Sequence, residues 1–219
     1  MGKAERRLGG GLMEFTPRQA ATLAEIMHWR RDVRHFLADP VPEEALERLR
    51  LAMEHAPSVG NARPWRIIRV ESPDLRAAVR AEFMRCNQNA AAAYEGEQAA
   101  AYAKLKLAGL DAAPVQLAVF TETDPEAGHR LGRATMELTL QQSTAMAIYA
   151  LWLAARAENL GVGAVSILEP RVMERLFGVP ERWEFSAYLC IGKPAFTDDT
   201  PLLHRAEWQR NEETVWERR

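Results

Sequence analysis

The chain has 219 residues, of which 47% are apolar and 26% are charged, and its formal net charge is −2. These values are typical of a folded globular protein and exclude a disordered chain, a collagen-like repeat and a low-complexity scaffold. Because the net charge is near zero, the molecule as a whole does not attract nucleic acid or an anionic membrane, and any anion site must come from a local cluster.

Cysteine content and apolar segments together predict a cytoplasmic protein without a metal site. The two cysteines, Cys86 and Cys190, lie too far apart for a paired metal-ligand motif, and free thiols suit a reducing compartment. The five histidines show no metal-type spacing. The first residues lack the apolar core of a signal peptide, and the apolar stretch 145–155 is too short to span a bilayer.

Apolar periodicity, N-cap residues and prolines define the expected elements. Helices are predicted from Thr16-Pro17, over 43–56, from Ser72-Pro73 towards Leu110, over 130–159 and over 171–177. Short apolar runs predict strands at 64–70, 115–121, 164–168 and 185–191. No repeat or linker interrupts this order, so we expect a flexible leader over 1–15 and a single α/β-type domain over 16–219, with helices on both faces of a sheet.

The predicted helix 130–159 is apolar on most sides in its second half, and such a helix must be covered on nearly all sides. A sheet covers one side, and a second subunit is the natural cover for the other. The tail 192–219 has two tryptophans but no core of its own, which favours a segment that wraps over a neighbour. The pattern therefore predicts a homodimer.

The densest charge cluster is Arg30, Arg31, Asp32 and Arg34, directly after the first predicted helix. Three guanidinium groups this close repel one another, so the cluster indicates either a bound anion or several acidic partners. A phosphate monoester is the natural anion, because arginine binds it through two hydrogen bonds and stays charged. The alternative is a solvated basic turn that pairs with acids such as Glu43, with Asp32 only a counter-ion.

Two further segments are candidates for ligand contact. Residues 56–65, APSVGNARPW, place Ser58 and Asn61 in a tight connection into a strand, where they either face a planar polar ligand or only form the loop. In 161–168, GVGAVSIL, the glycines follow a helix and precede a strand, so the segment is not a dinucleotide fingerprint. Ser166 is there either a functional hydroxyl or a buried one bonded to backbone.

Taken together, the RRDVR turn, the APSVGNARPWR loop and the GVGAVSIL segment resemble the nitroreductase-like flavoproteins, which bind FMN at a homodimer interface. Within that group, the segments 85–120, GHRLGRATM, LWLAARAENLGVGAVSIL and AYLCIGKP resemble the 5,6-dimethylbenzimidazole synthase family. The resemblance extends from about Arg30 to Trp208. Its most specific element is Asp32, where ordinary nitroreductases usually have serine or another small residue.

The resemblance implies a three-layer α+β fold, with a central, mostly antiparallel sheet flanked by helices, and a homodimer with exchanged C-terminal tails. It implies that reduced FMN is a substrate, fragmented with dioxygen to 5,6-dimethylbenzimidazole, the lower ligand of vitamin B12, and erythrose 4-phosphate. Electrons come from a separate NAD(P)H-dependent flavin reductase. The alternatives are an NAD(P)H-dependent FMN nitroreductase or flavin reductase, which needs no carboxylate at position 32, and a non-enzymatic flavin-binding module.

The resemblance also implies roles for single residues. The flavin-binding positions are matched by Arg30, Arg31, Asp32, Arg34, Ser58, Asn61, Val165, Ser166 and Leu168. Asp32 is implied to shuttle protons and Ser166 to assist fragmentation, while residues 89–109 resemble a lid over the flavin. The chain departs from the usual family pattern at Arg130, Glu137, Leu138, Ala164, His204 and Glu207.

Overall fold

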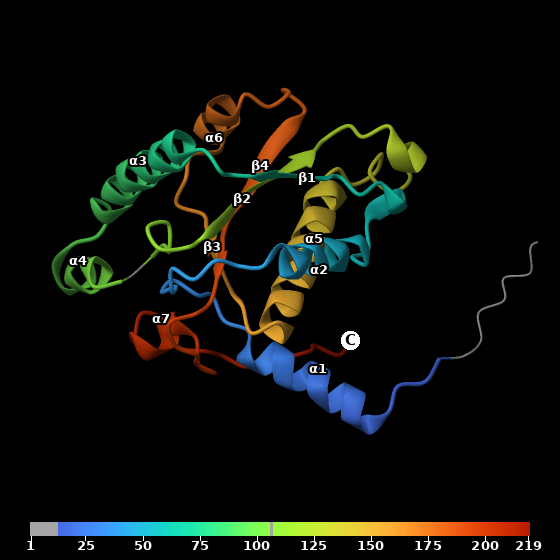
Figure 1. Cartoon of the computed structure of the whole chain (residues 1–219), viewed down its shortest axis with the longest axis horizontal. Coiled ribbons are helices and arrows are strands. Elements are labelled where there is room, and N and C mark those ends of the chain that lie inside the picture. The colour runs from blue at the N-terminus through green and yellow to red at the C-terminus, as the bar shows by residue number, and fades with distance from the viewer. Residues whose placement is uncertain (1–12, 106) are drawn as a thin grey trace, which may run out of the picture.

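Four strands form one antiparallel sheet in the order β1-β2-β4-β3 (Figure 1). The structure is a computed structural model that describes residues 13–105 and 107–219. The strands are β1 (Trp65–Arg69), β2 (Val115–Glu122), β3 (Gly161–Val165) and β4 (Trp183–Gly192). The helices are α1 (Pro17–Trp29), α2 (Glu43–Glu54), α3 (Pro73–Ala91), α4 (Gly96–Ala103), α5 (Thr139–Ala157), α6 (Pro170–Phe177) and α7 (Leu202–Arg205), with short 3₁₀ turns η1 (Val59–Asn61) and η2 (Ala127–Arg130).

Both faces of the sheet are buried, and β2 shows why. Its alternate side chains enter two separate cores: Ala118 and Phe120 pack with α3 and α6, whereas Val115 and Val119 pack with α2 and α5. Side chains on a strand alternate between faces, so a strand covered on both sides reads as a continuous apolar run. The result is the predicted three-layer α+β arrangement, with helices on both faces of an antiparallel sheet.

Local sequence signals define several element ends. Thr16 and Gln19 form a capping box at the start of α1, and Ser72 caps α3. Gly178 adopts the left-handed conformation that ends α6. Within the described residues, no helix is long and apolar enough to cross a bilayer.

Three element boundaries were predicted wrongly. The helix expected over 130–159 begins only at Thr139, because His129, Arg130 and Gly132 have positive φ angles that a right-handed helix does not allow. The helical region after Ser72 divides into α3 and α4, and residues 105 and 107–110 are not helical. The strand expected over 164–168 lies at 161–165 instead, so its glycines belong to the strand.

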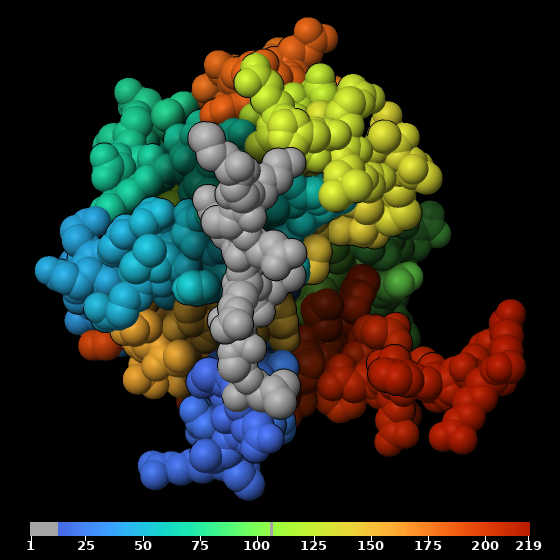
Figure 2. Space-filling model, turned by 90° about the vertical axis from the view of Figure 1, so that its right-hand side faces the viewer, coloured from blue at the N-terminus to red at the C-terminus, as the bar shows by residue number. Residues whose placement is uncertain are grey.

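The two chain ends differ from the expectations in separate ways. Of the leader predicted over 1–15, residues 1–12 lie outside the described residues, and Met13–Phe15 are exposed without regular structure. The first part of the tail packs on its own chain, where Trp208 contacts Tyr94 and Tyr102. Beyond Trp208 the tail is exposed, and Figure 2 shows its end (red) extending as an arm from the body of the molecule. Tail exchange therefore stays a prediction.

Glu82 of α3 is a buried carboxylate that joins α3 to the start of α6. Its oxygens accept hydrogen bonds from Arg85 at 2.8 and 2.6 Å, from the Cys86 thiol at 3.1 Å and from the backbone N–H of Glu169 at 3.2 Å. The hydrogen bonds, that from Arg85 above all, lower the pKa of Glu82 from 4.5 to about 2. The ionised form is therefore favoured by folding.

We expect Glu82→Gln to be less stable than the parent protein by about 1–3 kcal/mol at pH 7, and equal to it near pH 2. Because the folded-state pKa is depressed, the stabilisation is complete above the ordinary pKa of the carboxyl and is lost as the pH falls towards 2. Urea unfolding of both proteins between pH 2 and 7 measures the difference. Glu47→Gln, which alters an exposed pair with Arg50, is the control, and equal midpoints at pH 7 would contradict the prediction.

Candidate functional site

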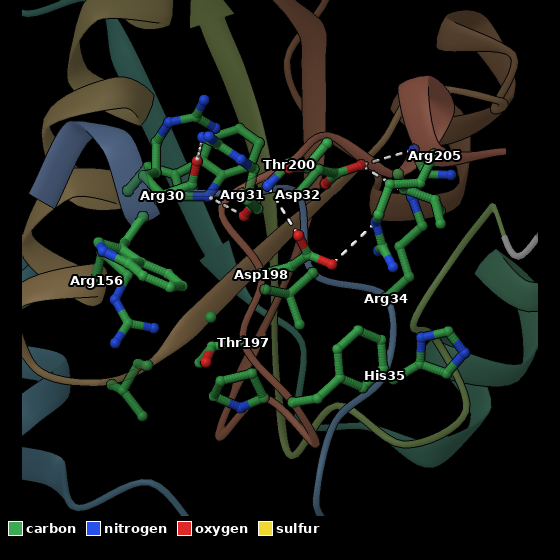
Figure 3. Close-up of a pocket in the computed structure, with 18 residues that line it drawn as sticks. Arg30, Arg31, Asp32, Arg34, His35, Arg156, Thr197, Asp198, Thr200 and Arg205 are labelled. Carbon is green, nitrogen blue, oxygen red and sulfur yellow. Dashed lines mark hydrogen bonds and ion pairs between the residues drawn. The ribbon is translucent and has the colours of Figure 1, made fainter. Parts of the chain in front are cut away.

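A cavity opens between the segment that follows α1, the C-terminal half of α5 and the tail (Figure 3). Its charged lining residues are five arginines and two carboxylates: Arg30, Arg31, Arg34, Arg156 and Arg205, with Asp32 and Asp198. This excess of positive charge favours an anion with several oxygen atoms, such as a phosphate group. The cavity volume of about 50 Å³ admits a small group but not a ring system, since drug-sized ligands occupy roughly 300–1,000 Å³.

Asp32 is fixed at the edge of the sheet by its backbone and its side chain. The segment Asp32–Val33 runs parallel to β3, and the Val33 N–H donates to the Val162 carbonyl at 3.0 Å. Carboxylate oxygen Oδ1 accepts a hydrogen bond from the backbone N–H of Ala164 at 2.9 Å. Oxygen Oδ2 accepts from Nε and Nη2 of Arg34 at 2.9 and 2.7 Å. With 31% of the side chain exposed, this oriented carboxylate is still accessible to a ligand.

Gly163 explains how the segment after α1 comes so close to β3. A Cβ atom at this position would lie 2.1 Å from the backbone carbonyl oxygen of Val33. Only glycine permits this approach, because backbone atoms cannot move aside as a flexible side chain can. The glycine in the strand is therefore a requirement for the position of Asp32.

The three clustered arginines point to different partners. Arg34 binds Asp32, whereas Nε of Arg31 donates to the carbonyl oxygen of Asp199 at 2.8 Å. Arg30 lies over the rings of Trp152 and Tyr149, at 5.1 and 5.8 Å from their centroids. Partial burial and the neighbouring Arg30 lower the pKa of Arg31.

The alternative in which this turn pairs with Glu43 is wrong, because both Glu43 oxygens accept hydrogen bonds from Arg69. Instead, Nε of Arg30 is buried and has no hydrogen-bond partner within the described part of the chain. A buried donor without an acceptor is costly, and the cavity beside it holds more positive than negative charge. The donor set therefore fits the phosphate end of a flavin mononucleotide.

Ser58 and Asn61 belong to a second cluster. The loop that carries them is held by α5, where the Val59 N–H donates to Oγ of Ser143 at 3.0 Å. It is also held by η2, because Gly60 and Gly128 touch through their backbones, and a Cβ at Gly60 would lie 2.8 Å from the Gly128 oxygen. Asn61 is exposed at the tip with a φ of 55°. These contacts fix a loop that presents a short polar side chain to solvent.

The structure does not bring Ser58 and Asn61 to the arginine cavity, as a single site in one chain would require. The loop contacts α5 at Ser143, whereas the cavity is lined by Trp152 and Arg156 of the same helix. Nine residues separate Ser143 from Trp152, which corresponds to about 14 Å along the helix axis. One chain therefore contains two partial sites.

Ser166 was considered as a buried strand hydroxyl, and this alternative is wrong. It follows β3 by one residue, and its side chain is exposed. Val165 and Leu168, in contrast, are 2% and 6% exposed and pack in the core. Any contact of these two residues with a ligand must come from their backbone atoms.

Sequence reasoning missed Arg156, Asp198 and Arg205 in the cavity lining. Arg156 has the position of an ordinary arginine near a helix C-terminus, and the tail carries no motif, so no local signal marked them. The departures from the family pattern lie outside the lining of the arginine cavity. The backbone N–H of Ala164 donates to Asp32, His204 belongs to α7, and Glu207 follows α7. Arg130 is the last residue of η2, which contacts the Ser58 loop, and it lines a separate pocket with Glu137. Leu138 precedes α5.

The chain is similar to known proteins over most of its length. The sequence profile described as Nitroreductase family matches residues 27–193. A 5,6-dimethylbenzimidazole synthase of Rhodobacter capsulatus is 63% identical over 207 residues, which are 94% of this chain and all of the relative. A 5,6-dimethylbenzimidazole synthase of Rhodospirillum rubrum is 48% identical over 89% of this chain and 92% of the relative.

Among solved structures, oxidised iodotyrosine deiodinase bound to FMN and 3-iodo-L-tyrosine has a TM-score of 0.71. It is 23% identical, and the match covers 90% of this chain and 99% of that one. At this identity the match establishes a shared fold.

We expect Gly163→Ala to lower the free energy of unfolding by about 3 kcal/mol, because the new methyl group forces the Asp32–Val33 segment off β3. Gly178→Ala is the matched control, because its Cβ has no neighbour within 4 Å. Only the strain of a left-handed alanine then lowers the free energy of unfolding, by about 1 kcal/mol. Thermal and urea unfolding measure both. Equal losses in the two variants would show that the close approach of Val33 is not required.

Proposed function

The chain belongs to the nitroreductase family and, within it, to the 5,6-dimethylbenzimidazole synthases, and from this we propose that it fragments reduced FMN with dioxygen to 5,6-dimethylbenzimidazole and erythrose 4-phosphate. Relatives with this name are similar over nearly the whole chain. The single structural observation that carries the proposal is the oriented carboxylate of Asp32 at the arginine cavity.

A carboxylate at this position suits fragmentation better than hydride transfer. Breaking several C–C and C–N bonds needs repeated proton transfers, and a side chain that accepts and returns protons must lie within reach of the reacting chain. The Ala164 N–H and Arg34 fix both oxygens of Asp32. Oδ2 accepts two hydrogen bonds from Arg34, whereas Oδ1 accepts one and keeps a lone pair for a substrate hydroxyl. Asp32 is therefore proposed to hold and move protons at Oδ1.

The arginines are proposed to bind the phosphate and orient the substrate. Arg31 and Arg34 line the cavity from the segment after α1, Arg156 from α5 and Arg205 from α7, and this shared lining supports the proposal. Bound reduced FMN supplies both the electrons that reduce dioxygen and the carbon skeleton of the product. A phosphate held at one end fixes the position of the chain relative to Asp32, which lowers the entropic cost of reaction. The exposed hydroxyl of Ser166, just beyond β3, is proposed to assist the bond-breaking steps.

A homodimer is proposed because the Ser58 loop and the arginine cavity meet α5 at Ser143 and Trp152, which are about 14 Å apart along the helix axis. A second subunit can place its own Ser58 loop over the cavity of the first. The surface beside the cavity supports this: α1 has no buried residue, and Leu23, Met27, Met146 and Tyr149 are exposed apolar side chains on α1 and α5. The extended arm after Trp208 is available for exchange with that subunit.

Light scattering at micromolar concentration is expected to give twice the 24.6 kDa of one chain. Replacing Tyr149 and Met146 by glutamate is expected to yield monomers that still fold, since both side chains are exposed on α5. A wild-type protein that remains monomeric at this concentration would refute the shared site.

The activity itself is tested with the full chain, FMN, an added NAD(P)H-dependent flavin reductase, NADH and air. We expect 5,6-dimethylbenzimidazole in the product mass spectrum and only slow oxidation of NADH when the reductase is left out, because a separate enzyme is proposed to reduce the flavin. Rapid turnover of NADH and a nitroaromatic without the reductase, together with no benzimidazole, would assign the chain to the hydride-transferring alternative instead.

Asp32→Asn tests the role of the carboxylate. The amide is nearly isosteric, but its NH₂ group replaces one of the two accepting oxygens, so the hydrogen bond from either Ala164 or Arg34 is lost. Removing the negative charge strengthens the attraction of the arginines for phosphate, so we expect FMN still to bind. Because an amide cannot exchange protons at these oxygens, we expect benzimidazole formation to fall about 10²–10⁴-fold, with reduced FMN returning as oxidised FMN and hydrogen peroxide. Bound FMN and benzimidazole are measured on the same sample.

Asp39→Asn is the control, because Asp39 is an exposed carboxylate of the same segment. It is expected to match the parent protein in both measurements. An Asp32→Asn variant that binds FMN and forms product at the parental rate would mean that Asp32 is only the counter-ion of Arg34.

A further inference from the structure

The tail segment 194–208, here named the strap, runs from the sheet past the arginine cavity to α4. At its start, the Ala195 N–H donates to the carbonyl oxygen of His35 at 2.9 Å, and the rings of His35 and Phe196 lie 5.4 Å apart. Figure 1 shows α7 of the strap next to α4. The strap thus contributes to the cavity lining and also contacts the aromatic side chains around α4.

In its middle, the strap contacts one arginine of the cavity lining and contributes another. Nε of Arg31 donates to the carbonyl oxygen of Asp199, and Nε of Arg205 lies 2.9 Å from Oδ2 of Asp198. Arg205 itself belongs to the strap, whereas Arg31 and Arg34 belong to the segment after α1. An anion that binds guanidinium groups from both segments therefore fastens the strap to the body of the protein.

At its end, the strap places Trp208 against two tyrosines. The Trp208 ring lies 5.3 Å from the Tyr94 ring and 5.9 Å from the Tyr102 ring, and the two tyrosine rings are 4.9 Å apart. The hydroxyl of Tyr102 donates to Oδ1 of Asn87 in α3 at 2.7 Å. This aromatic cluster connects the strap to both ends of the α4 region.

Helix α4 depends on that cluster. It has eight residues, a length at which an isolated helix is not stable in water, and Tyr102 is its one buried side chain. Without the contact of Trp208, Tyr102 loses a neighbour that covers it. The position of α4 is therefore governed by the aromatic cluster rather than by a broad packed face.

We propose that the strap couples anion binding at the arginine cavity to the position of α4 in which Tyr102 packs against Trp208, here called closed α4. Trp208 is the positioning residue that holds α4 there. The inference rests on the proposed binding of the FMN phosphate by these arginines. A phosphate that joins Arg205 to Arg31 and Arg34 restrains the strap, and the restrained strap keeps Trp208 on Tyr102. By linkage, closed α4 strengthens FMN binding by the same factor by which FMN stabilises closed α4, so the loss of Trp208, which favours the closed position, weakens FMN binding.

The test is amide hydrogen exchange of the full chain with and without FMN, together with the FMN dissociation constant. In the parent protein, FMN is expected to slow exchange over Gly96–Ala103. In Trp208→Leu, exchange over the same residues is expected to be about tenfold faster without FMN, and FMN is expected to restore little protection. FMN affinity is expected to fall several-fold, although Trp208 carries no charge and lies outside the cavity lining.

Two further variants make the result specific. Trp216→Leu removes an exposed tryptophan of the arm and is expected to behave as the parent protein, whereas Trp208→Phe keeps an aromatic ring and is expected to restore most of the protection. Unchanged protection of the β2 and β4 amides shows that each variant is folded.

The outcomes separate the coupling from the proposed function. A parent protein that does not bind FMN refutes the proposed function. A parent protein that binds FMN without a change in α4 exchange, or a Trp208→Leu variant in which FMN protects α4 as in the parent, refutes the coupling alone. Inorganic phosphate in place of FMN is expected to produce a smaller protection of the same residues, because it engages the arginines without the rest of the molecule.

Discussion

The contact between the Asp32 carboxylate and the backbone of β3 determines the arrangement of the whole site. Gly163 admits the Val33 carbonyl, and the next residue, Ala164, donates its N–H to Asp32. Arg34 is in turn oriented by the other carboxylate oxygen. The groups proposed to bind phosphate and to transfer protons thus lie on one short segment. The position of this segment is fixed by a backbone approach that a Cβ at position 163 would prevent.

The length of α5 sets the second constraint. It supports the Ser58 loop near its first turn, through Ser143, and the arginine cavity near its last turns, through Trp152 and Arg156. Because α5 is rigid, these two groups stay apart along its axis. We propose that the Ser58 loop of a second chain completes the site, with the tail and α1 beside the interface.

Much of the fold and the family could be predicted from the sequence, because those signals are local. The capping box at Thr16, the apolar run of β2 and the RRDVR segment each have a meaning that needs no distant partner. The failures have physical causes of two kinds. His129 and Arg130 have positive φ angles, so α5 begins later in the chain than predicted. Histidine and arginine do not usually indicate this backbone conformation, so the sequence did not reveal it. Arg205 enters the cavity only because the tail folds back.

A crystal structure of the full chain with FMN tests the proposed shared site most directly. We expect the phosphate between Arg31, Arg34 and Arg205, and the ribityl chain beside the Asp32 carboxylate. We also expect the flavin ring to contact Ser166 of one subunit and Asn61 of the partner subunit. A flavin whose phosphate lies away from these arginines, or whose ring contacts one chain alone, would contradict it.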